Sequence, residues 1–80
     1  STEESQKNEI SVYYKDQSFV VQASSTVRRI KITDTSGKLL GDYTNNKNHF
    51  EADATVLPLG MYFVEILSDK GTVVKKVLKK

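Results

Sequence analysis

Residues 61–78 read MYFVEILSDKGTVVKKVL, two apolar runs on either side of a short polar segment. In the first run Tyr62, Val64 and Ile66 alternate with their neighbours, and a period of two is the pattern of a β-strand with one buried face. The polar segment ends at Gly71 and is typical of a turn. The sequence therefore predicts a β-hairpin, in which the second strand carries apolar side chains on both faces and its facing stays open.

Short apolar-rich segments separated by turn residues continue upstream of this hairpin as far as Ile10. They predict five further strands, at residues 10–14, 18–23, 27–34, 38–43 and 49–53. Val27 is out of phase with the alternation of Ile30 and Ile32, which indicates a bend or bulge. No segment has a helical period, so the chain is expected to be an all-β antiparallel sandwich or barrel. Its predicted core contains Ile30, Ile32, Tyr62, Val64 and Ile66.

The length of 80 residues fits one domain. Residues 1–9 contain no large apolar side chain and are predicted to be a flexible linker, so the domain is expected to span residues 10–80. No apolar run is long enough to span a membrane, and no secretory signal peptide is recognised at the N-terminal end. The net charge of +2 is too small to indicate a nucleic-acid partner. Because the chain has no cysteine, disulfides and thiolate chemistry are excluded.

Catalysis is not expected. His49 is the only histidine, and no cysteine is present to build a site around it. The aspartates fall in separate turns rather than in one calcium-binding segment, and the isolated glycines form no phosphate loop. The sequence therefore predicts no enzyme activity, no cofactor, no metal and no small-molecule substrate.

The C-terminal end is basic. Lysines occupy positions 75, 76, 79 and 80. Such a strand can contact phosphate or an acidic partner, or its charges can guard an edge strand against unwanted pairing. The aromatic residues are not interleaved with these lysines, so nucleic acid is not expected as a partner.

Three segments, taken in order, resemble a known family. Residues 27–40 are similar to a strand–turn–strand pattern with Asp34 and Gly37-Lys38 in its turn. Residues 53–66 contain Leu57-Pro58-Leu59-Gly60-Met61-Tyr62, and residues 69–80 contain a glycine followed by paired lysines. Together they resemble the C-terminal sorting domain (type A) of cargo proteins of the type IX secretion system of Bacteroidetes. Many members have Tyr-Pro-Asn-Pro after the first strand, whereas this chain has Tyr13-Tyr14-Lys15-Asp16-Gln17.

The resemblance implies a seven-stranded antiparallel immunoglobulin-like β-sandwich that serves as a secretion signal. The implied partners are the type IX outer-membrane translocation and sortase machinery, and a sortase-like protease typically removes the domain. The implied route leads through the periplasm to the outer membrane, the cell surface or the medium. The residues implied in recognition by the family-like motif are Gly37, Lys38, Leu57, Pro58, Gly60, Tyr62, Gly71, Lys75, Lys76, Lys79 and Lys80.

An adhesive or structural β-sandwich module of a surface protein is the alternative that the residues leave open. One local expectation applies to both functions. Gly60 begins the strongest strand directly after the Pro58 segment, so it is expected to adopt a backbone conformation, or to make a close approach, that a side chain disfavours.

Overall fold

The computed structural model describes residues 10–80 and contains five β-strands. They are β1 (Ile10–Lys15), β2 (Ser18–Thr33), β3 (Leu39–Asp53), β4 (Gly60–Ser68) and β5 (Gly71–Lys79). All pairings are antiparallel, which confirms the predicted all-β class. No helix within residues 10–80 is long and apolar enough to cross a membrane. The predicted linker at residues 1–9 lies outside the described residues.

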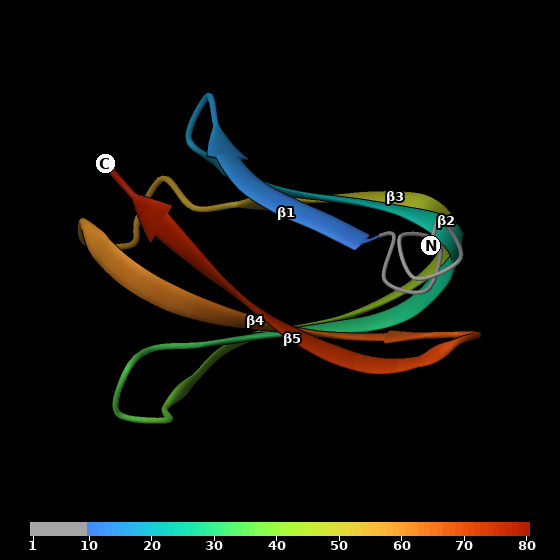
Figure 1. The fold of residues 1–80 in the computed structure, drawn as a ribbon. Helices are drawn as coiled ribbons and strands as arrows, with labels where there is room; N and C mark the ends of the chain where they lie inside the picture. Colours follow the sequence, from blue (N-terminus) through green and yellow to red (C-terminus); the bar gives the residue numbers. More distant parts are fainter. Residues whose placement is uncertain (1–9) are drawn as a thin grey trace, which may run out of the picture.

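One continuous sheet folds over on itself to make two layers (Figure 1). The first half of β2 pairs with β1, its second half pairs with β4, and β3 follows its other side along both halves. β5 pairs with β4 and completes the second layer. Figure 1 shows β2 and β3 passing from one layer to the other at a common bend, with most of the turns at the opposite end.

The predicted count of seven strands is wrong, because two predicted breaks lie inside continuous strands. β2 spans the predicted strand 18–23 and all but the last residue of 27–34, and β3 spans most of 38–43 and all of 49–53. The β2–β3 register shifts between Gln22 and Val27 and again between Val27 and Arg29. Such bulges bend a strand without ending it, which confirms the irregularity expected at Val27.

The side chain of Asn45 explains why an asparagine-rich segment continues as a strand. Its Nδ2 donates to the carbonyl oxygens of Lys47 at 2.9 Å and Val27 at 3.1 Å. The amide group thus supplies hydrogen bonds where the shifted register leaves backbone acceptors without their usual partners.

The core lies between the two layers and contains all five predicted residues, Ile30, Ile32, Tyr62, Val64 and Ile66. The first layer contributes Phe19 and Val21, which are also fully buried. The ring of Phe19 lies 5.5 Å from that of Tyr62 and 5.9 Å from that of Tyr14, measured between centroids. Each such buried side chain contributes about 1.5–3 kcal/mol.

The facing of β5 is decided by its neighbours in the sheet. Val73 and Val77 point toward the core, whereas Val74 and Leu78 are exposed on the outer face. Lys79 shares the inward face with Val77 and is buried.

The turn between β1 and β2 consists of Asp16 and Gln17, whose φ angles are +52° and +65°. Two successive residues with positive φ are the conformation of a type I′ hairpin turn. Proline has a φ fixed near −65° and does not fit either position. The absence of prolines at this point of the chain therefore agrees with the conformation of the turn.

Candidate functional site

The turn between β2 and β3 is organised by the carboxylate of Asp34. Its Oδ1 accepts hydrogen bonds from the Ser36 hydroxyl at 2.6 Å and from the backbone N–H groups of Ser36 at 2.9 Å and Lys38 at 3.0 Å. These hydrogen bonds lower the pKa of Asp34, and the bond from the Ser36 hydroxyl has the largest effect, followed by the bond from the Lys38 N–H. Gly37 completes the turn with a φ of +90°, a region that favours glycine. The turn therefore fixes the position at which Lys38 enters the edge of the sheet.

A second aspartate turn begins the segment between β3 and β4. Asp53 Oδ1 accepts hydrogen bonds from the hydroxyl of Thr55 at 2.6 Å and from its N–H at 2.9 Å, and these bonds lower the pKa of Asp53. The N–H of Leu57 then donates to the carbonyl oxygen of Ala54 at 3.1 Å. Leu57 and Pro58 thus leave a turn whose conformation is fixed by local hydrogen bonds.

Tyr62 ties this segment to the core. Its ring packs in the core beside Phe19, and its hydroxyl donates to the carbonyl oxygen of Pro58. Gly60 lies between them with a φ of +143°, which confirms the conformation expected there. A Cβ added to Gly60 meets no atom within 4 Å, so a side chain is disfavoured by backbone strain rather than by a clash.

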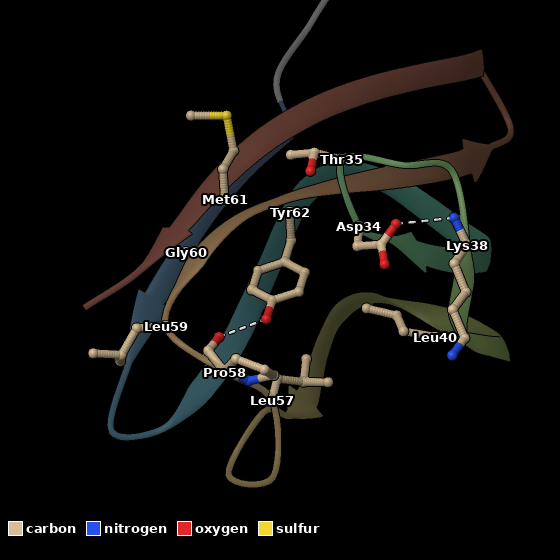
Figure 2. Close-up of a pocket in the computed structure, with 10 residues that line it drawn as sticks. All are labelled: Asp34, Thr35, Lys38, Leu40, Leu57, Pro58, Leu59, Gly60, Met61 and Tyr62. Carbon is tan, nitrogen blue, oxygen red and sulfur yellow. Dashed lines mark hydrogen bonds between the residues drawn. The ribbon is translucent and has the colours of Figure 1, made fainter.

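The Asp34–Lys38 turn, Leu40 and the Leu57–Tyr62 segment line a groove with a volume of about 450 Å³. In Figure 2 the side chains of Tyr62, Leu57 and Leu40 point into it, whereas Leu59 and Met61 point away. The groove brings together predicted recognition residues that are far apart in the sequence, namely Lys38, Leu57, Pro58, Gly60 and Tyr62. Gly37 lies in the turn beside it.

The side chain of Lys79 binds the backbone of the loop that leads into the groove. Its ammonium donates to the carbonyl oxygens of Leu57 at 2.6 Å, Ala54 at 2.7 Å and Thr55 at 3.3 Å, and the residue is only 7% exposed. An ammonium has three N–H donors, so these three carbonyl oxygens can satisfy it completely. The end of β5 therefore fixes the conformation of the segment that carries Leu57 and Pro58.

Contact with an acidic partner and protection of a strand edge both require exposed lysines, and Lys79 is buried. Lys75 points to the same inward face of β5 as Lys79 and is half-buried, whereas Lys76 and Lys80 are exposed. Gly71 lies at the other end of β5, in the turn of the β4–β5 hairpin, with a φ of +122°. The structure thus separates the predicted recognition residues into a groove, its buried support and an exposed strand face.

Asp34 and Leu40 line the groove but are absent from the residues predicted for recognition. The Asp-x-Ser-Gly sequence identifies Asp34 as a turn residue, although nothing in that sequence shows that the turn borders a groove. Leu40 is half-buried and packs against the core, so an isolated sequence segment presents it as an ordinary strand residue.

His49 lies within β3 on the outer surface, with its Nε2 3.1 Å from Oε2 of Glu51. No group of three or more His, Cys, Asp or Glu side chains within residues 10–80 has an arrangement that holds a metal ion. The charged pairs Arg28–Asp69 and Arg29–Asp42 join neighbouring parts of the fold at 2.8 and 2.7 Å and lie away from the groove. The groove is therefore a surface of apolar side chains and backbone, with Asp34 and Lys38 on one side.

A family model described as "Secretion system C-terminal sorting domain" matches residues 5–80. The chain belongs to this family. The match covers nearly the whole chain and confirms the resemblance to the sorting domains of type IX secretion. It also decides between the two functions left open by the residues: this sorting domain is a secretion signal and not only a structural module. The sorting domain directs export to the outer membrane, the cell surface or the medium, and it interacts with the type IX secretion machinery.

No curated protein matches the chain in sequence. Among solved structures, it is similar to part of "The structure of CBM51-2 and INT domains from Clostridium perfringens ZmpB", with a TM-score of 0.62 and 15% identity. The alignment covers 86% of this chain and 17% of that one, so the sorting domain corresponds to about a sixth of the larger protein. At this identity the similarity supports the fold alone.

Proposed function

We propose that the type IX machinery recognises the sorting domain through the groove formed by the Asp34–Lys38 turn and the Leu57–Tyr62 segment. The observation that carries the proposal is the convergence of two family-like segments, separated by about twenty residues, on one surface. The hydrogen bond from Tyr62 to Pro58 and the support from Lys79 hold this surface in one conformation. A preformed surface binds a partner without a further ordering cost.

The test fuses residues 1–80 to the C-terminus of a periplasmic reporter in a bacterium that has a type IX system. We expect export of the reporter in that strain and retention in a strain that lacks the translocon. The change Lys38→Glu reverses a charge at the groove, and Lys47→Glu makes the same change at an exposed position of β3 outside it. Export reduced by Lys38→Glu and retained by Lys47→Glu supports recognition at the groove, and equal export by both contradicts it.

We also propose that the two layers form an immunoglobulin-like sandwich. A tyrosine whose hydroxyl bonds to backbone a few residues upstream, near the start of a strand, is the tyrosine corner of that fold. Tyr62 and Pro58 have this arrangement, four residues apart. Each of the bent strands β2 and β3 contributes one half to each layer, so the five strands provide seven strand segments in the two sheets.

After export through the periplasm and across the outer membrane, a sortase-like protease is proposed to remove the sorting domain by cleavage within residues 1–9. This sorting domain itself is proposed to have no enzyme activity. Mass spectrometry of the exported reporter tests the cleavage. A product that ends within residues 1–9 supports the proposal, and an exported product that retains residues 10–80 contradicts it.

A further inference from the structure

The outer face of the β4–β5 hairpin gathers large apolar side chains. Val74 is 58% exposed, Leu78 is 47% exposed and Met61 is 42% exposed, and Phe63 beside them is half-buried. Single exposed apolar residues are ordinary on protein surfaces, but a contiguous group of them marks an interaction site.

The strand register makes these side chains contiguous. Met61 lies opposite Leu78, and Phe63 lies opposite Lys76. In an antiparallel pair, the residues two positions to either side of a direct partner are diagonal neighbours at roughly 7–8 Å. Phe63 therefore lies next to both Val74 and Leu78. We call the five residues Met61, Phe63, Val74, Lys76 and Leu78 the β4–β5 patch.

Lys76 is the charged member of the patch. Glu65 lies on the same outer face, directly opposite Val74 in β5 and directly opposite Lys31 in β2, so Lys31 is its direct cross-strand neighbour and Lys76 is a diagonal one. Farther along the same outer face, Arg29 is paired with Asp42 at 2.7 Å, so that charge already has a partner within the domain. Lys76 forms no ion pair with any carboxylate in the described part of the chain. A carboxylate on a partner that covers the patch would complement the charge of Lys76.

We propose that the β4–β5 patch docks a protein surface of the translocation machinery that presents apolar side chains around a carboxylate. This proposal rests on the proposed function and extends its recognition surface. Met61 connects the two: its residue forms part of the groove wall, while its side chain points away from the groove in Figure 2. One partner can therefore cover both the groove and the patch.

Two pairs of matched variants test the proposal in the reporter fusion with residues 1–80. Lys76→Glu reverses the charge in the patch, and Lys70→Glu makes the same change in the turn at the far end of the hairpin. Val74→Glu places a charge among the apolar side chains of the patch. Its control, Thr72→Glu, places the same charge two residues earlier on the outward face of β5, outside the patch. We expect export to fall about tenfold or more with Lys76→Glu and Val74→Glu, because like charges or a buried charge would then face the partner. The two controls should be exported like the parent.

Thermal melts of the 80-residue chain accompany the export assay. Lys76 is exposed, so Lys76→Glu is expected to keep the parental melting temperature and carries the test even where Val74→Glu unfolds the domain. Normal export of a folded Lys76→Glu variant overturns the proposal. Failure of the unmodified fusion to be exported overturns the proposed function itself, which separates the two results.

Two further outcomes would assign the patch to another occupant. Vesicles of phosphatidylglycerol and phosphatidylcholine that bind the parent chain but not Lys76→Glu would identify a lipid-binding face. A parent chain that dimerises in analytical ultracentrifugation, while Val74→Glu stays monomeric, would identify a contact between copies. Either result overturns the docking of a translocation protein.

Discussion

Lys79→Met is the change that most directly tests how the groove is held. Methionine keeps an unbranched side chain beside Val77 but has no N–H donor for the carbonyl oxygens of Ala54, Thr55 and Leu57. Hydrogen bonds from a charged donor contribute about 1.5–3 kcal/mol each, and a buried acceptor left without a partner costs about 1–3 kcal/mol. The desolvation of the ammonium offsets part of this gain.

We therefore expect Lys79→Met to lower the free energy of unfolding by about 2–4 kcal/mol, the lower part of the summed range. A domain of this size gains or loses roughly 4–8 °C of melting temperature per kcal/mol, so the midpoint should fall by roughly 10–25 °C. The assay is a thermal melt of the 80-residue chain followed by circular dichroism. Lys76→Met is the control, because Lys76 lies on the same strand but is exposed.

Hydrogen exchange shows where the loss of stability occurs. In Lys79→Met, the amide of Leu57, which donates to Ala54, should exchange faster relative to the core amide of Ile30 than it does in the parent. Midpoints of Lys79→Met and Lys76→Met within about 2 °C of each other would refute the reasoning, because the three hydrogen bonds would then carry no net stability.

Three further perturbations have expected outcomes. Gly60→Val should lower the free energy of unfolding by about 1–3 kcal/mol through backbone strain, and an unchanged melt would contradict this. Gln17→Gly should raise it by about 0.5 kcal/mol, since glycine adopts the positive φ of the I′ turn without strain; a lower urea midpoint would count against that conformation. Melting temperatures should also fall as the pH drops below about 4, because a carboxylate with a lowered folded pKa stabilises the fold above its unfolded pKa and loses that effect when protonated. The groups responsible are Asp34, Asp42, Asp53 and Asp69, and an Asp34→Asn/Asp53→Asn variant that loses as much stability in acid as the parent would refute their role.

The alternation of side chains was sufficient to predict the hairpin of β4 and β5 and the buried set around Ile30 and Tyr62, because a period of two assigns residues directly to faces. It was not sufficient to count strands. Asn45 lies in a polar segment that is typical of a loop, yet its amide donates to backbone carbonyl oxygens and keeps β3 continuous. A side chain that replaces backbone donors has the same sequence signature as one that faces solvent.

The sequence predicts several residues of the groove individually, but it does not predict that they lie together on one surface. The resemblance identified Lys38, Pro58 and Tyr62, and the antiparallel pairing of β2 with both β3 and β4 brings them together. The role of Lys79 had no signal of its own. Lysine is rarely buried, and its partners are carbonyl oxygens of residues 54–57, which carry no side-chain signature.

The position of Lys79 changes how a requirement for the C-terminal residues in export must be interpreted. Removal of Val77–Lys80 deletes strand pairs with β4, the buried Val77 and the three hydrogen bonds that hold the groove loop. Such a deletion is expected to abolish export even if the machinery never touches the last four residues. Replacing all four lysines together has the same ambiguity, since it removes the buried Lys79 along with the exposed Lys76. Only single changes separate the causes: Lys79→Met alters the support of the groove from inside, and Lys76→Glu alters the charge of the outer face. A loss of export in a Lys76→Glu variant with a parental melt assigns the effect to contact, whereas a loss confined to Lys79→Met assigns it to the fold.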